Sequence, residues 1–407
     1  MDFDVPEELR EVVELARHFA STDLREAEIE LDRFQDPLEA FSSETHGAIT
    51  KKMFALGLHK LTLASGVGGL GMPRLAKFLV EEELAAGGAG LASQMLVTSI
   101  AAVMIANWDL SDRHPVFKEY LEAYVEDDDG THSSAWTVTE PDVGSDIFTF
   151  NAPGIRMRAR ATPAKGGYVI SGAKSAWCTN GWLADMLVVM VNVEPNTDMD
   201  GTGTFLIPAS WPGVTKGRPI DKLGLRALNQ CEIAFNDVEV PAAFMVFPPD
   251  AGYQGLLDAF VTSGNTSVGS IALGVARNAY ELALAYAKER RQGGKAIIEH
   301  QLVAKKLFDA FRNIEAARLS LRRSAWLINQ DRGQPHLAFA ARVQASEVCR
   351  AVTADMMLIH GGNGITREYA IEKLYRDAGP LQVMDGTVDR VALKGAAHLG
   401  LPDPHLR

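Results

Sequence analysis

The spacing of apolar residues divides the chain into two helical regions on either side of a region of short strands. Over residues 7–33, apolar side chains recur every three to four positions with charged side chains between them, which predicts an amphipathic helix. Further helices are predicted for residues 77–86 and 91–108, around glycine breaks. We therefore expect an N-terminal helical domain over residues 1–130.

The pattern changes in the middle of the chain, where short β-branched segments alternate with turn residues. Strands are predicted for residues 135–139, 154–161, 168–171, 186–193, 203–207 and 232–240. Because no helical pattern separates these segments, they favour an antiparallel sheet or a small barrel over a doubly wound parallel sheet. We expect a central β domain over residues 131–241.

Helical spacing returns after residue 242. Apolar residues recur on one face between residues 302 and 321, and Gly333 and Pro335 interrupt the pattern before another helix over residues 337–360. Long helices with short connections pack as a bundle. We expect residues 242–407 to form a C-terminal four-helix bundle, which makes the whole chain an α+β protein.

Charge and composition restrict the partners and the compartment. A formal net charge of −12 leaves no basic excess for neutralising phosphates, so we expect no nucleic-acid partner. Three scattered cysteines are too few for a disulfide framework or a zinc cluster, and we expect no metal site. Residues 84–108 are uncharged but contain glycines and polar residues, which favours a buried helix over a membrane span. The acidic N-terminus resembles neither an export signal nor a transit peptide, so a cytoplasmic protein is expected.

Two segments of the β region are suited to a planar, phosphorylated ligand. Residues 137–146, with the sequence TVTEPDVGSD, end a strand and enter a turn with small hydroxyls and free backbone N–H groups. Such a segment can hydrogen-bond the rim of a heterocycle and then a phosphate oxygen. Residues 176–181, with the sequence AWCTNG, add an indole that can pack against a ring system and a hydroxyl that can donate to a ring heteroatom.

These two segments are similar to the flavin-contacting strand ends of the acyl-CoA dehydrogenase superfamily of flavoproteins, which the chain resembles over essentially its full length. The other similar segments are LGLR at 223–226, FNDVEVP at 235–241, residues 289–301, HGGNG at 360–364 and EKLYRD at 372–377. The resemblance implies N-terminal helices, a central β domain and a C-terminal four-helix bundle. It also implies FAD bound without a Rossmann unit, and a homo-oligomer that is at least a dimer and usually a tetramer.

The resemblance also implies roles for individual residues. Those expected at the FAD of the same chain are Val138, Thr139, Ser145, Trp177, Thr179 and Thr387. The first two would bond the flavin ring, Trp177 and Thr179 would cover and bond its reactive edge, and the other two would lie near the diphosphate. Those expected to serve the FAD of a neighbouring subunit are Arg290, Gln301, Gly361 and Gly362.

Asp385 occupies the position of the superfamily's usual catalytic base, which is a Glu directly before Gly-Thr. Gly386 and Thr387 follow it, and the spacing from Gly361 matches without a gap. The base removes the α-proton of an acyl thioester while the β-hydrogen leaves as hydride to the flavin. Asp is one methylene shorter than Glu, which withdraws its oxygens by roughly 1.3–1.5 Å. A misplacement of about that size can reduce the rate about a hundredfold.

We expect an FAD-dependent dehydrogenase of acyl thioesters, carried by coenzyme A or a carrier protein, with Asp385 as the base. Electrons would pass to an electron-transfer flavoprotein or another acceptor. Nitroalkane oxidases of the same superfamily also use an Asp here, but they rely on an arginine seven residues later, where this chain has Ala392. Other members place a Glu on an earlier helix, at the position of Gly264. A nitroalkane-type oxidase, a flavin monooxygenase and a catalytically silent FAD-binding subunit are the alternatives.

Overall fold

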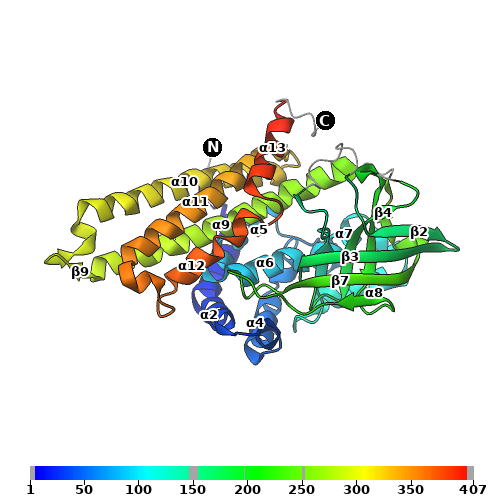
Figure 1. The fold of residues 1–407 in the computed structure, drawn as a ribbon, viewed down its shortest axis with the longest axis horizontal. Coiled ribbons are helices and arrows are strands. Elements are labelled where there is room, and N and C mark those ends of the chain that lie inside the picture. The colour runs from blue at the N-terminus through cyan, green and yellow to red at the C-terminus, as the bar shows by residue number, and fades with distance from the viewer. Residues whose placement is uncertain (1–4, 146–154, 197, 250–252, 401–407) are drawn as a thin grey trace.

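The computed structural model describes residues 5–145, 155–196, 198–249 and 253–400. Helices, then a β-sheet, then a second set of helices follow one another along the chain, as the apolar pattern predicts (Figure 1). The sheet lies at one end of the molecule, and a long bundle of helices projects away from it (Figure 1).

The N-terminal helices pack against both the sheet and the long C-terminal helices. They are α1 (Glu7–Phe19), α2 (Arg25–Arg33), α3 (Pro37–Phe41), α4 (Glu44–Ala55), α5 (Arg74–Gly87), α6 (Ala89–Thr98), α7 (Ile100–Asn107) and α8 (Pro115–Glu126). A π-helical turn, Ala20–Leu24, joins α1 to α2, so the predicted helix over residues 7–33 is continuous. The α4 helix begins where the Ser43 hydroxyl accepts a hydrogen bond from the backbone N–H of His46 at 3.2 Å, a normal N-cap.

The uncharged stretch forms α6 and α7, which are separated at Ser99. By length and composition, the segment Ala89–Asn107 could cross a membrane, but 61% of its most apolar window is buried inside the protein. The α6 helix packs against α5, α9 and the first strand. In this fold the stretch is therefore a core helix pair.

The central sheet has the strand order β6-β7-β3-β2-β4-β5-β8, and β1 pairs with β4. Its strands are β1 (Ser134–Thr137), β2 (Arg160–Ala164), β3 (Gly167–Thr179), β4 (Met186–Val193), β5 (Thr202–Pro208), β6 (Val214–Lys216), β7 (Gln230–Pro241) and β8 (Met245–Phe247). The short strands β6 and β8 were not predicted, and β3 extends eight residues beyond its predicted end at 171. Of the predicted strand 154–161, residue 154 lies outside the described residues, and the prediction is wrong for residues 155–159, because β2 begins at Arg160.

The expectation of a wholly antiparallel sheet is wrong at β4. Both β1 and β2 pair with β4 in parallel, whereas the other pairings are antiparallel. Parallel neighbours need a long connection, and the chain between β1 and β4 supplies one. All eight residues of β4 are buried, which is typical of a central strand covered on both faces.

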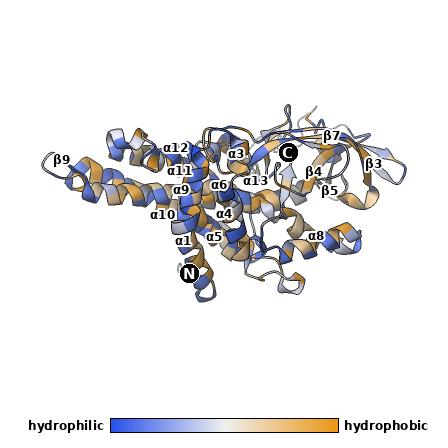
Figure 2. Cartoon of the chain, turned by 90° about the horizontal axis from the view of Figure 1, so that it is seen from below, coloured by the Kyte–Doolittle hydropathy of each residue, from blue (hydrophilic) through white to orange (hydrophobic). Residues whose placement is uncertain are grey.

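The C-terminal region is dominated by three long helices, α9 (Tyr253–Glu289), α10 (Gln301–Asn329) and α11 (Pro335–His360). The shorter helices are α12 (Ile371–Asp377) and α13 (Val388–His398), and α13 packs against α11. Pro335 occupies the first turn of α11, where its missing N–H costs nothing, and Gly361 ends the helix at φ 59°. In Figure 2 the projecting part of the bundle carries hydrophobic as well as hydrophilic residues.

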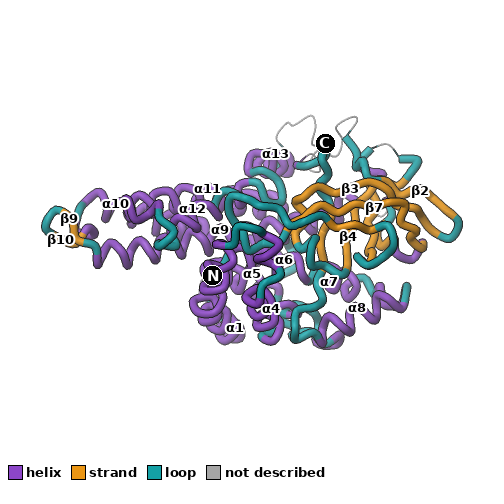
Figure 3. The backbone as a smooth tube through the Cα atoms, turned by 60° about the horizontal axis from the view of Figure 1, so that its bottom comes forward, coloured by secondary structure: helices purple, strands orange, loops and turns teal. Residues whose placement is uncertain are grey.

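A small hairpin closes the far end of the bundle. Its strands, β9 (Arg291–Gln292) and β10 (Lys295–Ala296), pair in antiparallel fashion. Figure 3 shows this hairpin at one end of the molecule and the sheet at the other. The α9 helix has 37 residues, so at a rise of about 1.5 Å per residue it is roughly 55 Å long and connects the two ends.

A set of buried charged residues ties the two helical regions together. We call it the charge clamp, and its members are Glu28, Asp32, Lys373, Arg376 and Asp377. Lys373 Nζ lies 3.0 Å from Glu28 Oε1 and 2.6 Å from Asp377 Oδ2. The Arg376 guanidinium donates to both carboxylate oxygens of Asp32, at 2.8 and 2.6 Å. The EKLYRD motif is thus explained by packing of α12 on α2.

The charge clamp also fixes two backbone segments. The Glu28 carboxylate accepts hydrogen bonds from the N–H groups of Gly90 (2.9 Å) and Leu91 (3.1 Å) at the start of α6. Asp377 Oδ1 accepts one from the N–H of Leu225 at 2.7 Å, inside the LGLR segment. Negative charge at a helix N-terminus is favourable, so this arrangement stabilises the junction between the domains.

Candidate functional site

The first predicted FAD segment is held rigidly at the end of β1. The Thr139 carbonyl accepts hydrogen bonds from the N–H of Ser175 (2.9 Å) and from its hydroxyl (3.2 Å). The Val138 carbonyl accepts one from Lys174 Nζ at 3.2 Å. Val138 and Thr139 are both half-buried, so each retains surface for a ligand.

Lys174 is the residue that fixes this strand end, and the sequence did not identify it. Its side chain is fully buried, and its ammonium lies 2.6 Å from Glu140 Oε1. It also donates to the carbonyl of Met190 on β4. The Glu140 carboxylate in turn accepts hydrogen bonds from the backbone N–H groups of Arg158 and Ala159. The Glu of the TEP sequence therefore holds the turn and has no free oxygen for a ligand.

The second predicted segment presents an exposed indole beside a hydroxyl. Trp177 and Thr179 alternate with the buried Cys178 on β3, so their side chains lie on one face of the strand. Trp177 is 59% exposed, which is unusual for so large an apolar side chain. The Thr179 hydroxyl accepts a hydrogen bond from Gln230 Nε2 at 3.2 Å. The pair can cover and bond one edge of a planar ring.

Asn180, the next residue, is structural. It is fully buried at φ 62°. Its amide donates to the carbonyls of Gln94 and Ser134, both at 3.2 Å, and so joins α6 to β1. The Asn of the AWCTNG sequence therefore anchors the end of β3, next to Trp177 and Thr179, to the interior.

Ser145 and Thr387, both expected at the diphosphate, meet in the structure although 242 residues separate them. The backbone N–H of Thr387 donates to the Ser145 hydroxyl at 3.3 Å. Thr387 is also the N-cap of α13, where its own hydroxyl accepts a hydrogen bond from the N–H of Arg390. Two hydroxyls at the N-terminus of an eleven-residue helix suit a phosphate group.

Asp385 lies two residues before this contact, in a left-handed turn. Its φ is 51°, a conformation that Asp tolerates better than most residues, and Gly386 follows at φ 98°. A Cβ at Gly264 on α9 would lie 3.4 Å from Asp385 Oδ2. The two positions at which members of the superfamily carry the base are therefore neighbours, and the missing side chain at Gly264 leaves space beside the carboxylate.

The environment of Asp385 combines desolvation with access. Burial raises the pKa of its carboxyl above the ordinary value, and the positive charges of Arg342 and Lys77 oppose this rise. The residue is nevertheless exposed. A carboxyl that is desolvated by the protein and still accessible to a ligand suits a general base.

The remaining predicted FAD residues lie at the far end of the bundle. Arg290 follows α9, Gln301 begins α10, and Gly361 and Gly362 follow α11. All four are exposed, and a Cβ on either glycine would have no heavy atom within 4 Å. Gly264 and the end of α9 are separated by about 38 Å of helix, so one chain does not bring these residues to Asp385.

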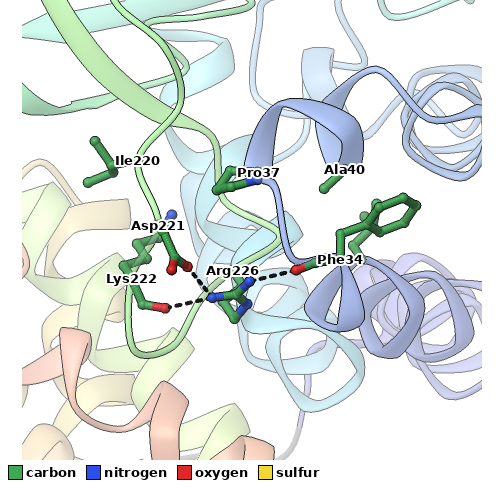
Figure 4. A pocket seen from close by; sticks show the side chains of 8 residues that line it. Phe34, Pro37, Ala40, Ile220, Asp221, Lys222 and Arg226 are labelled. Carbon is green, nitrogen blue, oxygen red and sulfur yellow. Dashed lines mark hydrogen bonds and ion pairs between the residues drawn. The ribbon is translucent and has the colours of Figure 1, made fainter.

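Two other hollows do not belong to this site. The hollow in Figure 4 is too small to admit a water molecule, and its lining comprises Leu31, Phe34, Pro37, Ala40, Ile220, Asp221, Lys222 and Arg226. Arg226 occupies it, donating to the carbonyl of Phe34 at 2.6 Å and pairing with Asp221. A cavity of about 420 Å³ between α1, α5, α9 and α10 is lined by arginines and glutamates, of which Arg277 and Glu83 pair at 2.7 Å. Among the described residues, there is no group of three or more His, Cys, Asp or Glu side chains that could hold a metal ion.

Three family models match the chain. They are the N-terminal domain of acyl-CoA dehydrogenases over residues 6–108, the middle domain over 135–238 and the C-terminal domain over 256–399. The probable acyl-CoA dehydrogenase YngJ of Bacillus subtilis (strain 168) is 30% identical over 391 residues, which are 95% of this chain and 96% of that protein.

Solved structures show the same fold. Butyryl-CoA dehydrogenase from Megasphaera elsdenii superposes with a TM-score of 0.85 at 28% identity, covering 98% of this chain and 100% of that one. The FAD complex of PigA gives a TM-score of 0.85 at 26% identity, with the same coverage. These matches confirm the resemblance that the motifs predict. The chain belongs to the acyl-CoA dehydrogenase family and is a flavoprotein oxidoreductase of the acyl-CoA dehydrogenase type.

Proposed function

We propose that the protein binds FAD and dehydrogenates an acyl thioester, with Asp385 removing the α-proton. The observation that carries the proposal is the contact between Thr387 and Ser145. It brings the turn that contains Asp385 to the end of the strand segment expected to bind FAD. A base and a cofactor site that are two residues apart can act on adjacent carbons of one substrate.

The described residues fit FAD. The strand end at Val138 and Thr139 suits the ring, and Trp177 with Thr179 covers one edge of it. The hydroxyls of Ser145 and Thr387 at the start of α13 suit the diphosphate. Bound FAD supplies the acceptor for the hydride that leaves the β-carbon.

Asp385 is suited to take the α-proton because its carboxylate is desolvated. A raised pKa makes the carboxylate a stronger base. The space at Gly264 allows a substrate to approach the shorter side chain closely. The acyl carrier is coenzyme A or the phosphopantetheine arm of a carrier protein, and the electron acceptor is an electron-transfer flavoprotein or another oxidant.

A second copy of the chain would complete the FAD site. Arg290, Gln301, Gly361 and Gly362 are too far from Asp385 to serve the FAD of their own chain. The α10 helix exposes a set of large apolar side chains, and these are Leu302, Phe308, Phe311, Leu319 and Trp326. Exposed apolar surface of this kind is typical of an interface between subunits. It supports a homo-oligomer that is at least a dimer, with a tetramer as the expected assembly.

The test is flavin reduction without oxygen. FAD-loaded protein is mixed anaerobically with a panel of acyl-CoA and acyl-carrier-protein thioesters while the flavin absorbance is followed, and at least one thioester should bleach it. Asp385→Glu is run beside the wild type, because a gain on straight-chain acyl-CoA indicates a conventional pocket. Hydrogen peroxide formed in air from a nitroalkane, with no bleaching by any thioester, contradicts the proposal and supports the oxidase. No reduction by either class of substrate supports a silent FAD-binding subunit.

A further inference from the structure

Arg342 lies directly behind the Asp385 turn and is completely buried. It stands on α11, and its Cα is 3.3 Å from where a Cβ of Gly269 on α9 would be. Its Nη2 donates to three backbone carbonyls of the turn, those of Leu381 (3.3 Å), Met384 (2.7 Å) and Gly386 (3.0 Å). The last two carbonyls belong to the residues on either side of Asp385. One guanidinium therefore holds the backbone carbonyls of the residues immediately before and after the base.

The conformation of the turn explains why it needs such support. Asp385 and Gly386 both have positive φ, and a residue with a side chain adopts that region only where its surroundings impose it. The backbone bonds within the turn lie before Asp385, from Val383 and Met384 to the carbonyl of Pro380. After it, Arg342 bonds Gly386, and Thr387 contacts Ser145 and caps α13. Arg342 is thus the contact that spans the base from both sides.

Arg342 also provides a buried positive charge that acts on Asp385, whereas the arginine on which nitroalkane oxidases rely is absent from this chain. The position seven residues after the base is Ala392, so α13 offers no cation there. Burial lowers the pKa of Arg342 to about 10, and the negative charge of Asp385 acts in the opposite direction. Its Nε and Nη1 have no hydrogen-bond partner among the described residues. The charge is therefore not neutralised by a contacting carboxylate.

The groups that face Asp385 come from three helices. Arg342 on α11 and Lys77 on α5 are the charged ones, and Gly264 on α9 contributes no side chain. The Lys77 ammonium bonds the Ser267 hydroxyl at 3.1 Å and lies 3.6 Å from a carboxylate oxygen of Glu81, so its charge is shared with an acid. Arg342 has no such acidic partner among the residues that the structure describes, which makes it the stronger influence on Asp385.

We propose that Arg342 is a positioning residue for proton abstraction: it holds the Asp385 turn in its left-handed conformation and faces the carboxylate with a buried positive charge. It touches neither substrate nor FAD, and it acts through Asp385. The inference rests on the proposed role of Asp385 as the base, but it applies to whichever substrate reduces the flavin.

The experiment compares Arg342→Met, Arg342→Lys and the control Arg350→Met in the full-length, FAD-loaded protein. Arg350 lies on the same helix and is exposed. Flavin content, KM, the rate constant of anaerobic flavin reduction and its pH profile are measured with a substrate that reduces the wild-type flavin. In R342M the reduction rate should fall about 10- to 100-fold with little change in KM. The acid limb of the profile should move to higher pH, because the loss of the positive charge favours the protonated carboxyl.

The Arg342→Lys variant distinguishes a positioning role of Arg342 from a role in packing alone. It keeps the charge and has three donors for the three carbonyls, so R342K should recover most of the lost rate and the wild-type acid limb. R350M should match the wild type. A wild-type rate and pH profile in R342M contradict the inference, as does an R342K protein that retains FAD but is as slow as R342M. If R342M fails to bind FAD, Arg342→Gln replaces it as the neutral variant. The rate and pH profile of R342K then still decide whether the positive charge positions Asp385.

Failure of this inference is distinguishable from failure of the proposed function. If no thioester reduces the wild-type flavin, the proposed function fails before any Arg342 variant is compared. If a nitroalkane reduces it instead, the same variants are compared with that substrate, because it too loses a proton to the base. If a thioester reduces it and R342M is unaffected, only the role of Arg342 is wrong.

Discussion

The charge clamp and the Asp385 turn both bring acidic and basic side chains together inside the protein, but they differ in how the charges are paired. In the clamp, Lys373 lies between two carboxylates within 3.0 Å, and Arg376 meets Asp32 with two hydrogen bonds. At the turn, the Asp385 carboxylate has no hydrogen-bond partner among the described residues, and the nearest cations act on it only through space.

This difference in pairing suits the clamp to stabilising the fold and the Asp385 turn to reacting with a substrate. Removing one partner of a buried, paired charge leaves the other uncompensated, so the clamp is sensitive to substitution but chemically inert. A carboxylate without donors keeps its lone pairs for a substrate, at some cost to the stability of the fold. Substitutions at the Asp385 turn should therefore change the rate of flavin reduction, and substitutions in the clamp should change the stability of the fold.

The largest effect is expected for Asp385→Asn. The amide cannot accept the α-proton, so the rate of flavin reduction should fall about 10²- to 10⁴-fold or more, while FAD stays bound. The measurement is anaerobic stopped-flow absorbance with flavin content as the control. Reduction at a near wild-type rate would show that another group is the base.

A substitution in the clamp should have the converse outcome. Lys373→Met leaves the carboxylates of Glu28 and Asp377 buried together, which should lower the free energy of unfolding by about 3–5 kcal/mol. Thermal melting of the FAD-loaded protein checks this, with the exposed Lys288→Met as a matched control. The protein that remains folded should reduce its flavin at close to the wild-type rate. A specific loss of rate without loss of stability would break the comparison.

A smaller effect is expected on the stability of the fold when Asp385 is replaced by Asn. An acid whose pKa is higher in the folded protein stabilises the fold while it is protonated, and that contribution is lost as the pH rises through the raised value. Asn carries no charge at any pH. The melting temperature of D385N should therefore exceed that of the wild type by roughly 2 °C at neutral pH. The difference should vanish as the pH falls toward the ordinary value for Asp, and an unchanged difference would argue against desolvation.

The smallest effect is expected at Lys77. Its positive charge lowers the pKa of Asp385, but its ammonium already faces Glu81. Lys77→Gln keeps a donor for Ser267 and should reduce the rate of flavin reduction at neutral pH by less than about threefold, with the acid limb moving to higher pH. The pH profile is measured beside that of R342M. A larger shift than in R342M would place the dominant cation on α5 instead of α11.

The sequence predicted what short motifs and apolar spacing encode. Apolar spacing predicted the order of the helical and β regions, and the motifs predicted the family. The resemblance to that family also implied that Ser145 and Thr387 lie close together. The parallel pairing at β4 did not, because pairing partners distant in the chain leave no local pattern. Lys174 was missed for a similar reason: a lysine within a strand is usually solvated, and only the fold shows that Glu140 and two carbonyls surround it.

Arg342 was missed because its partners are backbone carbonyls, which are the same in every sequence. Only the approach of α11 to the turn identifies it. Motifs therefore predicted the residues that are expected to contact a ligand, whereas the residues that hold them in place became visible only in three dimensions. Asn180 is the exception, since it lies within a motif but serves the interior.

The length of α9 has a consequence for how the protein can vary. The helix carries Gly264 beside the base at one end and delivers Arg290 to the outer tip at the other, without a break. Because successive residues turn by about 100° around a helix, a single inserted residue would rotate the tip by that angle and displace it by about 1.5 Å. Four inserted residues would nearly restore the facing but lengthen the helix by about a turn. The α9 helix thus sets both the distance and the orientation of the tip relative to Asp385. The proposed sharing of residues between copies would therefore tolerate few insertions along this helix.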